Sequence, residues 1–151
     1  MVNGKKILLV EDNPRDVELT TRALQKSNVS NGMKVVEDGV EALNFLFGED
    51  GKSGCPPDEL PVVVLLDLKL PRIDGLEVLR RMRASEKTKL IPVVVLTSSN
   101  EESDLVASYD LGANSFVRKP VKFAEFAEAI RQLGLYWLIL NQAAPNGARR
   151  K

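Results

Sequence analysis

Val-Val-Val-Leu-Leu-Asp-Leu-Lys-Leu-Pro, at positions 62–71, is the most informative stretch of this 151-residue chain. Five consecutive apolar residues followed by an acid are typical of a β-strand that is buried on both faces, with the carboxylate emerging where the strand ends. Open α/β sheets place their chemistry at this carboxyl edge. Asp67 is therefore the first candidate functional residue.

A second apolar run, residues 7–10, also ends in acids, Glu11 and Asp12. If the two strands are parallel, all three carboxylates reach the same edge of the sheet. Clustered negative charges repel one another, so such a cluster needs a cation. Carboxylate oxygens are hard ligands of the kind that Mg²⁺ prefers. The sequence therefore predicts a magnesium site at Glu11, Asp12 and Asp67.

The composition excludes several other classes of protein. Lys plus Arg and Asp plus Glu each number 21, so no excess charge points to nucleic acid or to an anionic membrane surface. The apolar runs are too short for a signal peptide or a membrane span, and we expect a soluble cytoplasmic protein. The chain has no histidine and one cysteine, Cys55, in a stretch rich in Gly and Pro. Any chemistry must then use carboxylates, hydroxyls and lysine, and we interpret Cys55 as an incidental thiol.

Apolar strands alternate with amphipathic helices along the chain, which predicts a parallel α/β sheet. Asn13 is well placed as an N-cap, with Pro14 at the first helical position. A loop at 48–60 is rich in Gly, Pro and charge, and we expect it at the surface. Strands are expected at 7–10, 33–36, 62–66, 93–96 and 115–117. Helices are expected from Pro14, after Gly39, after Gly75, from Glu101 and from about Val121.

The later strands also end in residues suited to chemistry: Thr97 after the fourth, and Lys119 and Pro120 after the fifth. Singly, a threonine can cap a helix and a lysine can be solvated. Together on one edge, they favour phosphoryl transfer. A carboxylate such as Asp67 can attack phosphorus to give an aspartyl phosphate, while Lys119 and Thr97 interact with the phosphoryl oxygens.

Four motifs in register resemble the receiver domain of two-component response regulators. They are Val-Glu-Asp-Asn-Pro (10–14), Leu-Asp-Leu-Lys-Leu-Pro-Arg-Ile-Asp-Gly (66–75), Leu-Thr-Ser-Ser (96–99) and Phe-Val-Arg-Lys-Pro (116–120). The resemblance extends from about Lys5 to about Leu135 and implies a CheY-like (flavodoxin-like) fold. That fold is a five-stranded parallel sheet of order 2-1-3-4-5 with five helices, here with an extended C-terminal helix. We expect one domain at 1–140 and a flexible tail at 141–151.

The same resemblance implies a role for each matching residue. Asp67 would accept a phosphoryl group from a sensor histidine kinase, with Mg²⁺ as the cofactor. Phe116 would be a rotamer-switching aromatic, although ordinary core packing is the alternative for it. The other implied roles are metal ligands for Glu11, Asp12, Asp67 and the backbone carbonyl of Lys69, a switch hydroxyl for Thr97, a phosphate-pairing amine for Lys119 and a cis-proline for Pro120.

The 48–60 loop and an apolar extension of the last helix, Leu135 to Leu140, resemble stand-alone regulators that accompany bacterial phytochrome histidine kinases. The extension is apolar all round, so one helix cannot bury it against its own sheet. We expect a homodimer through the last strand and helix, and the alternative is that Trp137 folds back onto its own domain. Candidate interface residues are Phe116, Tyr136, Trp137 and Leu140.

Two other functions fit the sequence less well. A haloacid-dehalogenase-like phosphatase also forms an aspartyl phosphate, but enzymes of that kind resemble one another in a second acid two residues further on, where this chain has Lys69. A flavodoxin-like binder of a phosphorylated cofactor needs amides and hydroxyls after the first strand, where Glu11 and Asp12 would repel a phosphate. The sequence favours a signalling module that acts by protein contact and is not itself an enzyme.

Overall fold

The computed structural model describes residues 6–26, 32–51, 53–98 and 101–118, together with Glu128 and Gln132. Within these ranges the chain forms a five-stranded sheet, four α-helices and one short 3-10 helix. In chain order the elements are β1 (Ile7–Val10), α1 (Pro14–Lys26), β2 (Met33–Val36), α2 (Gly39–Phe47), η1 (Pro57–Glu59), β3 (Val63–Leu66), α3 (Gly75–Ala84), β4 (Val93–Thr97), α4 (Glu102–Asp110) and β5 (Ser115–Arg118).

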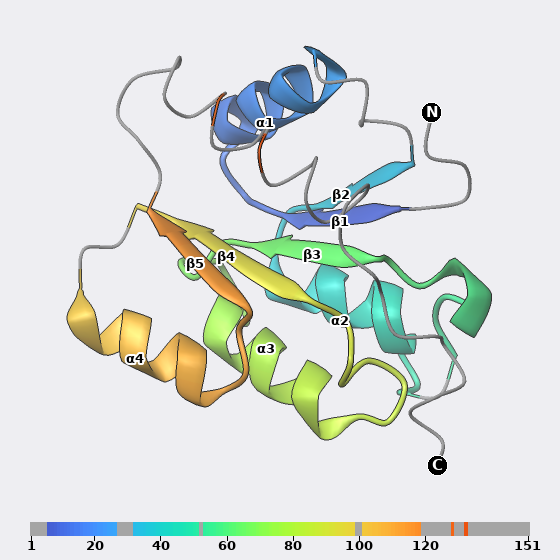
Figure 1. Cartoon of the computed structure of the whole chain (residues 1–151). Coiled ribbons are helices and arrows are strands. Elements are labelled where there is room, and N and C mark those ends of the chain that lie inside the picture. The colour runs from blue at the N-terminus through green and yellow to red at the C-terminus, as the bar shows by residue number, and fades with distance from the viewer. Residues whose placement is uncertain are drawn as a thin grey trace.

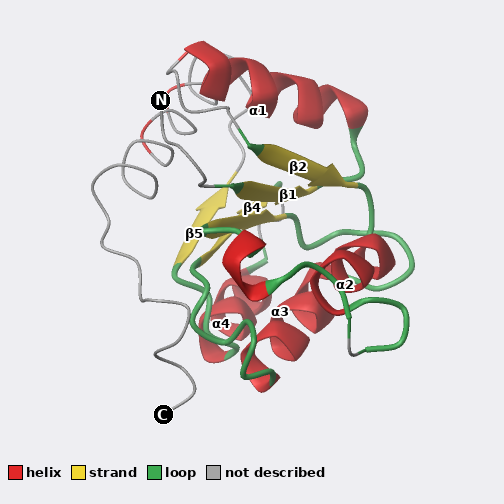
Figure 2. Ribbon diagram, turned by 90° about the vertical axis from the view of Figure 1, so that its right-hand side faces the viewer, coloured by secondary structure: helices red, strands yellow, loops and turns green. Residues whose placement is uncertain are grey.

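The strands lie in the order β2-β1-β3-β4-β5 and every neighbouring pair is parallel, which confirms the predicted topology. Helix α1 covers one face of the sheet, whereas α2, α3 and α4 cover the other (Figure 1). Figure 2 shows the same layers from the side, with α1 separated from the other three helices by the strands. Within the described residues, the loops that follow the strands line the carboxyl edge of the sheet (Figure 1).

Each central strand is apolar on both faces because it is covered from both sides. Successive side chains of a strand point to opposite faces, so the residues of β1 divide between two clusters. Leu8 and Val10 pack with the cluster that includes side chains of α2 and α3, whereas Ile7 and Leu9 pack with Ala23 and other side chains on the α1 face. The uninterrupted apolar runs of the sequence are therefore explained by burial on both faces.

Three helices begin at the carboxyl edge with a side-chain cap. The predicted cap of α1 is confirmed, because Asn13 Oδ1 accepts hydrogen bonds from the amides of Arg15 (2.9 Å) and Asp16 (3.3 Å). Two aspartates that we had not predicted as caps do the same for the next helices. Asp38 accepts from the Glu41 amide at 2.8 Å, and Asp74 accepts from the Glu77 amide at 3.0 Å. Such caps satisfy amides that have no partner within the helix.

The 48–60 loop is mostly exposed, as expected, but it is tied to the domain. The Lys87 ammonium donates hydrogen bonds to the carbonyl oxygens of Leu46 (2.5 Å) and Ser53 (3.3 Å). Leu60 at the end of the loop is buried. Cys55 is partly buried, and this burial raises the pKa of its thiol. A raised pKa favours the protonated thiol over the nucleophilic thiolate.

The fifth helix that we expect from about Val121 lies almost wholly outside the described residues. Glu128 and Gln132 are described and helical, and the Gln132 amide donates to Glu128 Oε2 at 2.9 Å. The apolar extension at 135–140 and the tail at 141–151 are not described. No helix within the described ranges is long and apolar enough to cross a membrane.

Candidate functional site

The three acids predicted from the sequence lie together at the carboxyl edge of the sheet. Val10 and Leu66 are register partners in the β1–β3 ladder, so Glu11 and Asp67 are the first residues beyond two neighbouring strands. One carboxylate oxygen from each of Glu11, Asp12 and Asp67 lies within 4.8 Å of the other two. The predicted grouping of these side chains is therefore present in the structure.

Burial makes it unfavourable to hold these three charged carboxylates close together. Glu11 is only 2% exposed and Asp67 7% exposed, while Asp12 faces solvent. Carboxylates in a poorly solvated position repel one another strongly, and a divalent cation relieves both the repulsion and the lost hydration. Three oxygen donors within reach of one point fit Mg²⁺, Mn²⁺ or Ca²⁺ and do not fit metals that prefer sulfur or imidazole.

Backbone amides hold two of these carboxylates in place. Glu11 Oε2 accepts a hydrogen bond from the Asn13 amide at 3.2 Å, and Asp67 Oδ1 accepts a long one, 3.4 Å, from the Lys69 amide. The Lys69 main chain therefore lies beside the Asp67 carboxylate, where its carbonyl was expected to serve as a further ligand.

Thr97 lies at the same edge, on the next strand of the sheet. Leu66 pairs with Val95 in the β3–β4 ladder, so Thr97 ends β4 close to the level of Asp67. Its side chain is fully buried. On β5, Phe116 is partly buried and packs against the core cluster that includes α2 and α3. This packing fits either interpretation of Phe116, so its role as a switch stays a prediction from the sequence.

The remaining predicted site residues cannot be placed. Lys119, Pro120, Tyr136, Trp137 and Leu140 all lie outside the described residues. Their predicted roles in phosphate pairing, in the cis-peptide bond and in dimerisation remain predictions from the sequence.

The loop that follows Asp67 is fixed against helix α2. Arg72 has a positive φ of 70°, a conformation that non-glycine residues seldom adopt. Its guanidinium contacts Asp38 Oδ2 at 3.3 Å, and the same Asp38 caps α2. The ion pair joins residues 34 positions apart in sequence, so neither partner could be recognised from a local pattern.

A second ion pair joins the same loop to helix α4. Lys69 Nζ lies 3.5 Å from Asp104 Oδ2, in the first turn of α4. The sequence does not distinguish Asp104 as a contact residue, because an acid in the first turn of a helix is usually explained by the helix dipole. Nothing in the local sequence indicates that its carboxylate faces Lys69.

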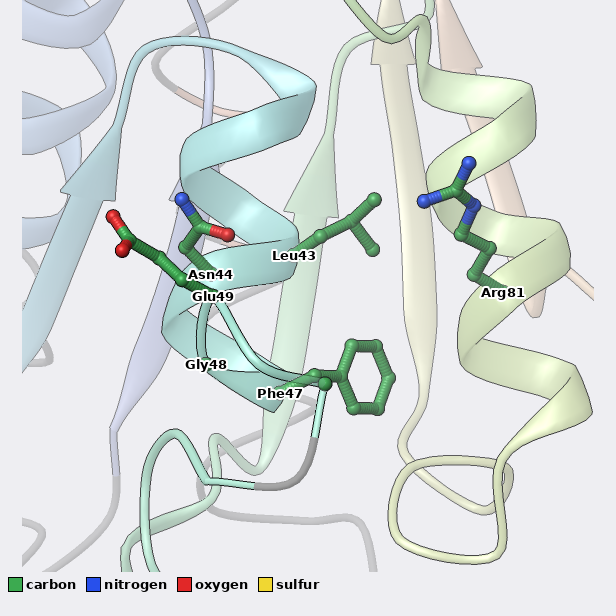
Figure 3. A pocket seen from close by; sticks show the side chains of 7 residues that line it. Leu43, Asn44, Phe47, Gly48, Glu49 and Arg81 are labelled. Carbon is green, nitrogen blue, oxygen red and sulfur yellow. The ribbon is translucent and has the colours of Figure 1, made fainter.

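A separate hollow of about 280 Å³ lies between α2 and α3, as Figure 3 shows. Its walls include Leu43, Phe47 and Glu49, with Arg81 on the opposite side. The hollow adjoins the C-terminal end of α2, whereas the acid cluster lies at the end of the sheet where α2 begins. It brings none of the predicted site residues together, so the acid cluster remains the candidate site.

Comparison with known proteins points to one family. The family model described as the response regulator receiver domain matches residues 7–131. Among curated proteins, the response regulator Rcp1 of Synechocystis sp. (strain ATCC 27184 / PCC 6803 / Kazusa) is 36% identical over 134 residues, which cover 89% of this chain and 89% of Rcp1.

Solved structures agree in fold over nearly the whole chain. A crystal structure of the phosphorylated cyanobacterial phytochrome response regulator RcpA has a TM-score of 0.85 and 36% identity, and the match covers 93% of this chain and 99% of RcpA. The Mn²⁺-bound form of Rcp1 has a TM-score of 0.83 and 33% identity, with coverage of 93% and 99%. The bacteriophytochrome response regulator RtBRR is 50% identical, with a TM-score of 0.70 and coverage of 97% and 89%.

Proposed function

Because this chain belongs to the response regulator receiver domain family, we propose that Asp67 accepts a phosphoryl group from a histidine kinase and that the chain signals by protein contact. The observation that carries the proposal is the convergence of Glu11, Asp12 and Asp67 at one edge of the sheet. The phosphorylated state of one similar regulator supports the acceptance of a phosphoryl group, and the Mn²⁺-bound state of another supports a metal beside the acceptor.

The residues of the chain would divide the chemistry in the following way. A carboxylate oxygen of Asp67 attacks phosphorus, the bond from phosphorus to the donor imidazole nitrogen breaks, and the imidazole leaves with the electron pair. The hydroxyl of Thr97 and the amine of Lys119 would donate to the phosphoryl oxygens. A divalent cation, when bound, neutralises charge on the transferring group.

We propose Mg²⁺ as the physiological cation, held by Glu11, Asp12, Asp67 and the backbone carbonyl of Lys69. The all-oxygen donor set supports this choice, since Mg²⁺ needs only one or two carboxylates and shares its remaining positions with water and phosphate. The position two residues beyond Asp67 is occupied by Lys69, where a phosphatase of haloacid-dehalogenase type would need an acid. We therefore propose a phosphoryl acceptor that holds its signal, and not an enzyme that turns over a substrate.

We propose that this chain is cytoplasmic and that its donor is a sensor histidine kinase of the phytochrome type. The similarity to RcpA and to the bacteriophytochrome regulator RtBRR supports this choice. We propose further that the regulator works as a homodimer, with no nucleic acid or membrane among its partners. The apolar extension at 135–140 in the sequence supports the homodimer.

The first test is metal-dependent labelling. With acetyl phosphate and Mg²⁺, the chain should gain the mass of one phosphoryl group, in a linkage that hydroxylamine cleaves because it is an acyl phosphate. Removing the metal with EDTA should reduce labelling to background, and Mn²⁺ should restore it. Labelling that persists in EDTA, or that resists hydroxylamine, would contradict an aspartyl phosphate formed with metal assistance.

The second test is sizing by light scattering. We expect the mass of two chains, either always or after addition of beryllofluoride and Mg²⁺. Replacing Trp137 by serine should shift the measured mass toward one chain, because an apolar contact surface is lost. A mass of one chain under every condition would refute the homodimer and favour a Trp137 that packs on its own domain.

A further inference from the structure

Helix α4 is attached to the rest of the domain very differently at its two ends. Past its C-terminal end, the Arg83 guanidinium donates to the carbonyl oxygen of Gly112 (3.0 Å) and to Asn114 Oδ1 (3.1 Å). The same guanidinium also donates to the Ile91 carbonyl oxygen at 2.8 Å. These bonds anchor this end of α4 to α3 and to the loop before β4. Arg83 is partly buried, and that burial lowers its pKa from the usual value for arginine.

Little of α4 itself is buried. Ser108 is its one buried side chain, while Val106 and Tyr109 are about half exposed. A helix with so small a buried face gains little stability from burial, so individual polar contacts matter more to its position. A side-chain contact at the first turn of α4 therefore helps to fix the position of that turn.

At the first turn, an ion pair between Asp104 and Lys69 joins α4 to the loop that follows Asp67. The two partners are exposed to different degrees, 14% for the Asp104 side chain and 62% for that of Lys69. The Lys69 amide donates to Asp67 Oδ1, so the stem of this lysine starts beside the candidate phosphoacceptor. One flexible ammonium can thus reach either Asp104 or a group carried on Asp67.

We propose that phosphorylation of Asp67 draws the Lys69 ammonium away from Asp104 and so releases the first turn of α4. This inference rests on the proposed function and identifies a contact through which the site would move that helix. A phosphoryl group carries nearly two negative charges, against one on Asp104, so it competes well for the ammonium. A partly exposed ion pair contributes little to stability, so the ammonium can exchange between the two anions.

The transfer of the Lys69 ammonium from Asp104 to the phosphoryl group can be tested with two variants. They should change the affinity for a phosphoryl mimic in opposite directions. If the ion pair opposes phosphorylation, removing its acid must favour the phosphorylated state. Asp104→Asn should lower the beryllofluoride concentration needed for half-saturation in Mg²⁺ by about two- to fivefold, the range in which partly exposed ion pairs contribute. Lys69→Met should raise that concentration, because the phosphoryl mimic loses its ammonium partner.

Amide hydrogen exchange supplies the second measurement. In the absence of beryllofluoride, both variants should exchange the amides of residues 105–108 faster than the unaltered chain does. Adding beryllofluoride should speed exchange in the unaltered chain and change little in the variants. Lys89→Met is the matched control, because its ion pair with Glu86 lies away from the acid cluster. It should change neither the half-saturating beryllofluoride concentration nor the rate of amide exchange.

A purely structural ion pair would give a different result. Both variants would then loosen α4, but neither would move the half-saturating concentration, and this outcome would overturn the inference while leaving the proposed function intact. Shifts of the same sign in both variants would overturn it as well. If the unaltered chain neither binds beryllofluoride nor takes up a phosphoryl group, the proposed function fails and the inference fails with it.

Discussion

Asp67→Asn is expected to reduce phosphoryl uptake from acetyl phosphate to the background of the assay. The amide is a poor nucleophile and cannot form an acyl phosphate, so the loss should be complete and not partial. Glu11 and Asp12 lie within ligand distance of the same point, but Glu11 is buried and both are expected to hold the metal. Labelling can be measured by intact mass or by radioactive phosphate in Mg²⁺.

Asp74→Asn is the matched control for this loss. Asp74 lies in the same loop and caps α3 by accepting the Glu77 amide at 3.0 Å. Asparagine caps helices about as well as aspartate, so this variant should fold and take up label normally. Label on Asp67→Asn at the level of the unaltered chain would show that Asp12 or Glu11 is the acceptor.

The melting temperature shows whether Asp67→Asn loses labelling because its nucleophile is gone or because the chain no longer folds. Without metal, the asparagine removes one of three clustered negative charges, two of them on buried side chains. We therefore expect its melting temperature in EDTA to be no lower than that of the unaltered chain. A lower melting temperature would mean that hydrogen bonds to the Asp67 carboxylate outweigh the repulsion.

The fold and the acid cluster could be predicted because the signals behind them are local. Burial on both faces produces apolar runs, and the residue after each run lies at a known edge of a parallel sheet. The run at 62–66 therefore predicted both β3 and the position of Asp67. The cap at Asn13 was equally local, since its acceptor serves amides two and three residues away.

The contacts that could not be predicted join segments far apart in the chain. Arg83 looks like a solvated residue on the polar face of α3, yet it bonds Gly112 and Asn114, 29 and 31 positions further along the sequence. Asp104 looks like a helix-dipole acid, although its carboxylate meets Lys69. The sequence pattern of charged residues does not identify their long-range partners, so such pairs are found only in the folded structure.

Gly75→Ala is expected to impair both the stability of the domain and phosphoryl uptake. A Cβ on this residue would lie 2.2 Å from the carbonyl oxygen of Asp67 and 2.8 Å from the Cα of Leu68. Both are backbone atoms, so no side-chain rotation can relieve the overlap, and the main chain around Asp67 has to move. Overpacking of this kind costs up to about 3 kcal/mol, and the better helix propensity of alanine offsets about 1 kcal/mol of it.

We therefore expect the free energy of unfolding of Gly75→Ala to fall by about 2 kcal/mol in urea titrations. Displacing the Asp67 backbone should also slow labelling, and misplacement by about 1 Å can cost on the order of a hundredfold. Gly51→Ala is the control that distinguishes steric overlap from backbone strain. Its Cβ would meet nothing within 4 Å, although its φ is 74°. It should cost about 1 kcal/mol through its left-handed conformation and leave labelling unchanged. If Gly75→Ala labelled as fast as Gly51→Ala, close packing of Gly75 against Asp67 could not be what positions the phosphoacceptor.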